Sequence, residues 1–130
     1  MEHAKTTASN VRGKDKAFRA ENLLDGGRDT FWSTDDQATT ADVVFDLGHH
    51  VTFNVIRIRE NIRLGQRVDA FAVEEAKDGG WSPVAEATSI GACRIVRTAK
   101  DVTTSRVRLR ITQAAACPAI SEFGLFLEKS

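Results

Sequence analysis

The feature that most constrains this chain is a strict alternation of apolar and charged side chains that recurs in two segments. Two segments show it, Val55–Arg59 and Val107–Ile111, in which arginines stand between aliphatic residues. Successive side chains of a β-strand point to opposite faces, so a period of two predicts a strand with one buried and one solvated face. The alternation therefore predicts half-buried strands.

Further segments of strand-forming residues lie at short, regular spacing after residue 40. Two of them are separated by Asp78-Gly79-Gly80, a strong signal for a tight turn. Seven or eight short strands at this spacing predict an all-β fold, an antiparallel sandwich or barrel. The predicted strands are Val43–Leu47, Val51–Glu60, Val68–Glu75, Trp81–Ala87, Ile90–Arg97, Val107–Ile111 and Ser121–Leu127.

The apolar members of these strands are predicted to form one core. A chain of 130 residues can bury roughly two-thirds of its unfolded surface, and the sequence contains no internal repeat, low-complexity tract or linker. We predict a single domain over residues 1–130, with residues 1–6 as a disordered tail. The predicted core residues are Val44, Leu47, Val55, Ile58, Val73, Val107, Leu109, Ile111 and Phe123.

The first forty residues follow a different pattern. Ala17–Leu24 predicts two turns of helix, which the glycine pair Gly26-Gly27 would end. The segment that follows is rich in aspartate and shows little periodicity. It predicts a loop.

Charge and composition argue against several partners. Lysine plus arginine total 18, as do aspartate plus glutamate, so no net charge favours nucleic acid or an anionic membrane. No apolar run reaches the length of about 18 residues that spans a bilayer. Met1–Asn10 also lacks the apolar core of a signal peptide. We therefore expect neither nucleic-acid binding nor membrane insertion.

The sequence offers no clear catalytic thiol. A reactive cysteine needs a histidine partner, and the pair His49-His50 falls in a predicted turn after a strand. Cys93 and Cys117 are predicted to be reduced thiols that pack as small hydrophobes. A disulfide between them, formed in an oxidising compartment, stays open.

Several stretches resemble a known family. Ala20–Trp32, AENLLDGGRDTFW, resembles the opening signature of discoidin domains, also called coagulation-factor C-type domains, which family 32 carbohydrate-binding modules share. Ala119–Leu125, AISEFGL, resembles their last strand. More narrowly, Asn61–Val68 and Cys117–Leu125 are similar to the module at the C-terminus of bacterial family 29 α-L-fucosidases. The resemblance extends from about Thr7 to Leu127.

This resemblance implies a particular all-β fold. It is an eight-stranded, antiparallel jelly-roll β-sandwich of the galactose-binding-like class, in which loops at one end hold the ligand. Trp32 is then expected in the core rather than against a sugar. Trp81 is expected to pack on the sheet rather than to face a ligand.

The resemblance also implies a structural calcium ion, held by six to eight oxygens between the first loop and the last strand. The alternative left open is that Asp25 caps a turn and Glu122 is solvated. Carried over, the expected ligands are the carboxylates of Asp25 and Glu122, the hydroxyl and carbonyl of Thr30, and the backbone carbonyls of Asn22, Gly27 and Ser121.

A sugar site is expected in the loops. Galactose-type sugars are held by an aromatic face together with charged or amide groups that bind adjacent hydroxyls. The chain has no tyrosine, so the aromatic face must come from Phe31, Trp32, Phe53 or Trp81. Salt bridging remains an alternative role for Arg63 and Arg67. The predicted sugar-binding residues are Glu60, Arg63, Gln66, Arg67 and Arg94.

We therefore expect a non-catalytic module that binds glycans of the galactose or fucose type. It would belong to a larger, extracellular or periplasmic glycoside hydrolase such as an α-L-fucosidase, whose catalytic domain is its second expected partner. The alternative is a structural accessory module that packs on a catalytic domain without binding sugar. An independent glycosidase needs two carboxyls in a cleft, and the resemblance assigns Asp25 and Glu122 to the metal instead.

Overall fold

The computed structural model describes residues 4–24, 30–61 and 67–128. Within these ranges, three 3-10 segments and seven antiparallel strands make up an all-β fold, as predicted. No helical segment of the described chain is long and apolar enough to cross a membrane. The elements are β1 Lys5–Ala8, η1 Arg12–Lys14, η2 Lys16–Phe18, η3 Ala20–Leu24, β2 Trp32–Ser33, β3 Ala41–Glu60, β4 Val68–Lys77, β5 Gly80–Thr88, β6 Arg94–Ala114 and β7 Ala119–Phe126.

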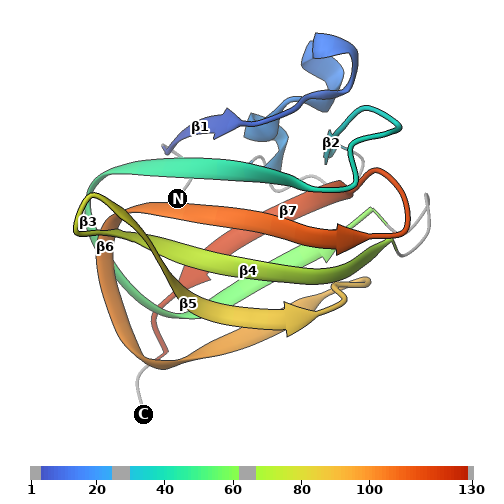
Figure 1. The fold of residues 1–130 in the computed structure, drawn as a ribbon. Coiled ribbons are helices and arrows are strands. Elements are labelled where there is room, and N and C mark those ends of the chain that lie inside the picture. Colours follow the sequence, from blue (N-terminus) through green and yellow to red (C-terminus); the bar gives the residue numbers. More distant parts are fainter. Residues whose placement is uncertain (1–3, 25–29, 62–66, 129–130) are drawn as a thin grey trace.

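Two long strands, β3 and β6, run through both layers of the sandwich (Figure 1). The first part of β3, Ala41–Asp46, pairs with the last part of β6, whereas its second part pairs with the start of β6 and with β7. A register shift between Asp46 and Val51 marks the bend between the layers. One layer thus adds β1, β4 and β5 to these half-strands, and the other adds β2 and β7.

Two of the strands that were predicted separately are parts of one long strand in the structure. The predicted strands Val43–Leu47 and Val51–Glu60 are both parts of β3, and the histidine pair His49-His50 between them lies exposed within this strand rather than in a turn. Likewise, β6 contains the predicted strand Val107–Ile111 and begins only at Arg94. Each long strand bends between layers while it stays extended, which a search for turn residues cannot detect.

Most of the predicted core is confirmed. Phe45 of one layer stacks on Phe123 of the other, with ring centroids 4.5 Å apart. The prediction for Val44 is wrong: its neighbours Val43 and Phe45 are fully buried, so Val44 points outward beside Arg108 and is half-buried. The other predicted core residues are buried, namely Leu47, Val55, Ile58, Val73, Val107, Leu109, Ile111 and Phe123.

The N-terminal segment belongs to the fold. Lys5 and Thr6 pair with β3 as part of β1, so the prediction of a tail over residues 1–6 is wrong for them. Residues 1–3 lie outside the described residues. The predicted helix at Ala17–Leu24 is instead two 3-10 segments, η2 and η3, because Arg19 between them has an extended backbone.

Both tryptophans lie where they were expected. The side chain of Trp32 is fully buried, and its Nε1 donates a hydrogen bond of 2.9 Å to the carbonyl of Asn10. Trp81 of β5 is half-buried against β6, where the guanidinium of Arg108 lies 4.8 Å from its ring centroid.

Candidate functional site

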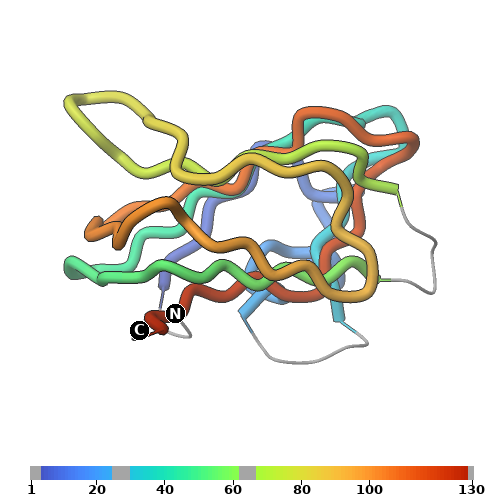
Figure 2. The backbone as a smooth tube through the Cα atoms, turned by 90° about the horizontal axis from the view of Figure 1, so that it is seen from below, coloured from blue at the N-terminus to red at the C-terminus, as the bar shows by residue number. Residues whose placement is uncertain are grey.

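Several connections between strands gather at the end of the sandwich that lies opposite the β4–β5 turn (Figure 2). At this end β3 finishes at Glu60, β5 at Thr88 and β6 at Ala114, while β4 and β7 begin. The segment between β2 and β3 lies at the same end. Loops carry binding residues most often where a rigid scaffold positions them, so this end is the candidate site.

Glu60 was predicted to bind sugar, and the structure gives it another role. Its side chain is buried, with 3% of the residue exposed. One carboxylate oxygen, Oε2, accepts hydrogen bonds from the backbone amides of Arg67 and Val68, at 2.8 and 3.4 Å. The other, Oε1, accepts from the amide of Gly91 at 3.1 Å. Glu60 therefore ties the start of β4 to the β5–β6 connection, and its assignment as a sugar ligand stays a prediction.

The other predicted sugar-binding residues have different outcomes. The guanidinium of Arg67 donates to the carbonyl oxygen and the Sγ of Cys117, at 3.0 and 3.2 Å. This contact fixes the arginine at the loop end. Arg94 is half-buried at the start of β6, and it does not line the cavity that contains Arg67 at the loop end. Arg63 and Gln66 lie outside the described residues.

A cavity of about 500 Å³ opens at this end, and we call it the loop-end pocket. It brings together two aromatic rings, two arginines, a carboxylate and a cysteine from five separate parts of the chain. The rings of Phe18 and Phe31 lie 5.4 Å apart and are tilted by 49°. The pocket is lined by Arg12, Phe18, Phe31, Ser33, Asp36, Arg67, Ala116 and Cys117.

An ion pair lies on the wall of the pocket. Nη1 of Arg12 lies 2.5 Å from Oδ1 of Asp36 and also donates to the carbonyl of Thr34 at 3.2 Å. The hydrogen bond from Asp36 and its charge raise the pKa of Arg12, so the guanidinium stays protonated. A permanent donor and an exposed acceptor are thus presented side by side.

The segment that carries Arg12 is held by Asp35. Its Oδ1 accepts from the amide of Gly13 at 2.8 Å, and its backbone amide donates to the side chain of Asn10, also at 2.8 Å. Gly13 has a positive φ of 59°, which glycine adopts without a steric penalty. The hydrogen bond from Gly13, followed by that from Asn10, lowers the pKa of Asp35. These bonds position Arg12 over the pocket.

Six of the eight residues that line this pocket were not predicted to bind a ligand. Arg12, Phe18 and Asp36 lie in the aperiodic first forty residues, where no pattern indicates which side chains converge. Phe31 was named as a possible aromatic face, and the structure places it there. Trp32 and Phe53 are fully buried and cannot contact a sugar.

The cysteines are free thiols. Cys117 is buried, as predicted, whereas Cys93 is exposed, so the prediction that Cys93 packs as a small hydrophobe is wrong.

The predicted calcium ligands are described only in part. Asp25 and Gly27 lie outside the described residues, and no group of three acidic, histidine or cysteine side chains that could hold a metal occurs in the part of the chain that is described. Glu122 accepts from Nε of Arg57 at 2.6 Å and lies 3.4 Å from Nε of Arg59. A cation there would share the carboxylate with two guanidiniums, so the donor set fits calcium only in part.

The remaining predicted ligands are consistent with roles in the fold. The side-chain amide of Asn22 donates to the carbonyls of Ala17 and Phe31, at 2.8 and 3.0 Å, which fixes the η3 segment. The hydroxyl of Ser121 donates to the carbonyl of Arg59 at 3.3 Å. Thr30 is exposed. The backbone carbonyls assigned to calcium stay a prediction.

Known proteins are similar to this chain in fold and in sequence. The α-L-fucosidase 1 of Arabidopsis thaliana is 31% identical over 125 residues, a match that covers 94% of this chain and 25% of that protein. A solved family 29 fucosidase of Ruminococcus gnavus in complex with fucose superimposes with a TM-score of 0.89 at 31% identity, over 100% of this chain and 26% of that one. The chain thus spans about a quarter of the length of the curated relatives it matches.

A third likeness concerns the fold alone. Chitosan-binding module 2 of a chitosanase/glucanase from Paenibacillus sp. IK-5, solved with chitotriose, superimposes with a TM-score of 0.81 at 18% identity, over 95% of each chain. Residues 5–123 match the F5/8 type C domain. The chain belongs to this F5/8 type C, or discoidin, domain family.

Proposed function

We propose that this domain is a non-catalytic carbohydrate-binding module whose sugar site is the loop-end pocket. The observation that carries the proposal is the composition of that pocket: aromatic rings lie beside an arginine–aspartate pair and a second arginine. Its relation to fucosidases and to a chitosan-binding module supports the same conclusion.

The pocket offers what a pyranose ring needs. The faces of Phe18 and Phe31 can pack against the C–H surface of the ring. Arg12 and Arg67 donate to its hydroxyl oxygens, and Asp36 accepts from its hydroxyl groups. Each hydroxyl gives up water to bind, so the net gain per hydrogen bond is about 1 kcal/mol. A shallow site of this kind is expected to bind with a Kd on the order of 0.1–1 mM.

Sugars of the fucose or galactose type are the proposed ligands, and an α-L-fucosidase that acts outside the cytoplasm is the proposed parent protein. Weak binding becomes effective when a tethered catalytic domain engages the same glycan surface, because the second contact is then intramolecular. The module would hold the enzyme near its substrate and take no part in bond cleavage.

The test is titration of the isolated domain with fucose, galactose and N-acetylgalactosamine, followed by isothermal calorimetry or ligand-observed NMR. Asp36→Ala removes an exposed carboxylate and should weaken binding at least about tenfold. Because the ion pair is exposed, the melting temperature should change by no more than about two degrees. Asp101→Ala, which removes an exposed carboxylate near the middle of β6 and outside the pocket, is the matched control. No binding up to tens of millimolar in the unmodified domain would contradict the proposal.

One observation favours a second candidate, a structural accessory module. The exposed large hydrophobic residues of the described chain, Ile95, Phe126 and Leu127, lie on β6 and at the end of β7, with exposures of 52%, 44% and 45%. Phe126 also covers Gly124, where a Cβ atom would lie 2.9 Å from its ring. Such a face suits packing on a catalytic domain. Domain binding without any sugar response would favour this role.

A further inference from the structure

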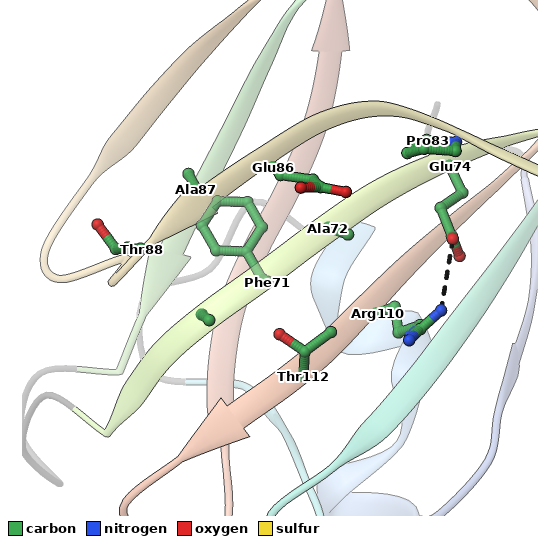
Figure 3. Close-up of a pocket in the computed structure, with 10 residues that line it drawn as sticks. Phe71, Ala72, Glu74, Pro83, Glu86, Ala87, Thr88, Arg110 and Thr112 are labelled. Atoms are coloured by element: carbon green, nitrogen blue, oxygen red, sulfur yellow. Dashed lines mark ion pairs between the residues drawn. The ribbon is translucent and has the colours of Figure 1, made fainter.

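A second hollow lies on the outer face of the β4 layer, and we call it the β4 trough (Figure 3). Its volume of about 610 Å³ falls within the range of about 300–1,000 Å³ that is typical of ligand sites. The two hollows share no lining residue. The trough exists because β4 presents Ala70 and Ala72 outward where the strands on either side present longer side chains.

The strand register arranges the walls of the trough. Ala72 lies between Glu86 of β5 and Arg110 of β6, and Ala70 lies opposite Thr88 of β5. Paired residues of neighbouring antiparallel strands point to the same face. Figure 3 shows the result: Glu86 and Thr88 stand on one side of the alanine floor, and Arg110 and Thr112 stand on the other.

A buried carboxylate fixes one wall. The side chain of Glu74 is only 8% exposed and forms ion pairs with Arg108 at 2.6 Å and with Arg110 at 3.5 Å. A buried carboxylate is tolerated only with such partners, so the arginines are held in place. Arg110 is nevertheless 51% exposed, which leaves part of its guanidinium open to the trough.

The remaining polar groups are free to bind a ligand. Within the described residues, the side chains of Glu86, Thr88 and Thr112 make no hydrogen bond or ion pair with the protein. The trough contains the carboxylates of Glu74 and Glu86 and the guanidinium of Arg110. With Arg108, which pairs with Glu74, the formal charges cancel. A charged ligand would gain nothing from this balance, whereas a neutral ligand with many hydroxyl groups could use acceptors, donors and the methyl floor together.

We propose that the β4 trough is a second carbohydrate-binding site, which takes a neutral glycan along the face of β4. The ligand class rests on the proposed function, but the site is independent of the loop-end pocket. Arg110 and Glu86 bind adjacent hydroxyls from opposite walls, and the floor of alanine methyl groups contacts the C–H face of the ring. Because the trough lacks an exposed aromatic face, it binds more weakly than the loop-end pocket.

The test is a ¹H–¹⁵N NMR titration of the domain with galactose, fucose and chitotriose as probes. We expect saturable shifts of the backbone amides of Ala70, Ala72 and Arg110. Ala70→Leu places a side chain in the trough and should raise the Kd reported by these amides at least about tenfold. Ala76→Leu is the matched control on the outer side of the same strand, opposite Trp81 and outside the trough, and should leave that Kd within about twofold.

Further variants separate the two sites. Thr112→Val removes a hydroxyl at constant shape and should weaken the trough by about fivefold to tenfold, even if Ala70→Leu proves unstable. Asp36→Ala should raise the Kd reported by the loop-end shifts at least about tenfold and leave that of the trough unchanged. Shifts at the loop end alone would overturn the second site but not the proposed function. Trough shifts that vanish in Asp36→Ala would also overturn it, and no saturable shift anywhere would overturn both.

Discussion

Replacement of Glu60 by alanine separates a structural role from a sugar-binding role. The carboxylate accepts two hydrogen bonds of 2.8 and 3.1 Å from the amides of Arg67 and Gly91, and a longer one of 3.4 Å from Val68. In Glu60→Ala these donors lose their partner in a site where the residue itself is 3% exposed.

The expected loss follows from these contacts. A hydrogen bond to a charged group contributes about 1.5–3 kcal/mol, and removal of a buried charge recovers part of its desolvation cost. For two good bonds and one long one we expect a net loss of about 2–4 kcal/mol. In a domain of this size, that corresponds to a fall in Tm of about 10 °C.

Urea unfolding and thermal melting measure the loss. Glu86→Ala is the control because Glu86 is exposed and its side chain makes no hydrogen bond or ion pair with the described residues. We expect the control to lie within about 0.5 kcal/mol of the unmodified domain. An unchanged stability in Glu60→Ala would refute the reasoning. If sugar binding disappeared at the same time, Glu60 would be a ligand, as its sequence context suggested.

Three further predictions concern the core, acid stability and calcium. Leu109→Ala should lower the free energy of unfolding by about 2–5 kcal/mol because it leaves a cavity in a fully buried site. Val44→Ala should lower it by less than about 1.5 kcal/mol because Val44 faces outward. Equal losses by urea unfolding would mean that the strand register is wrong. Hydrogen bonding lowers the folded-state pKa of Asp35, so its contribution to stability is present above the unfolded pKa of about 3.9 and is lost as the pH falls through the lower folded value. Asp35→Asn should therefore flatten the stability curve below about pH 4, and an unaltered acid unfolding curve would contradict this. Excess EDTA should lower the Tm if the predicted calcium site exists, since a bound ligand stabilises the folded state by mass action. A Tm that is the same with EDTA and with added calcium would contradict the calcium site, and the role of Glu122 would then be its ion pairs with arginine.

The alternation of side chains was sufficient to predict the fold class and most of the core. In Val107–Ile111, each aliphatic residue is buried and each arginine faces outward, as a period of two requires. This information is local, because the direction of a side chain in a strand depends only on its position along that strand. Where the apolar residues are contiguous, as in Val43–Phe45, the pattern is ambiguous, and only the pairing with β6 decides that Val44 points outward.

The site could be predicted far less well than the core. Glu60 was assigned from its place in a loop and Arg94 from the resemblance to related modules. The burial of Glu60, however, depends on backbone amides of two other connections, which donate to its carboxylate. The loop-end pocket joins Arg12 to Cys117, 105 residues apart in the sequence. No periodicity links such residues, because their proximity results from the closure of the sandwich.

The sequence by itself therefore determined which faces of the strands are apolar, since that depends on the order of neighbouring residues. Only the tertiary structure decided that β3 and β6 each bend through both layers, and that the alanines of β4 lie between longer side chains of β5 and β6. Both features arise from strand pairing between segments far apart in the chain. Pairing is a property of the whole sheet, and no single strand encodes its partner.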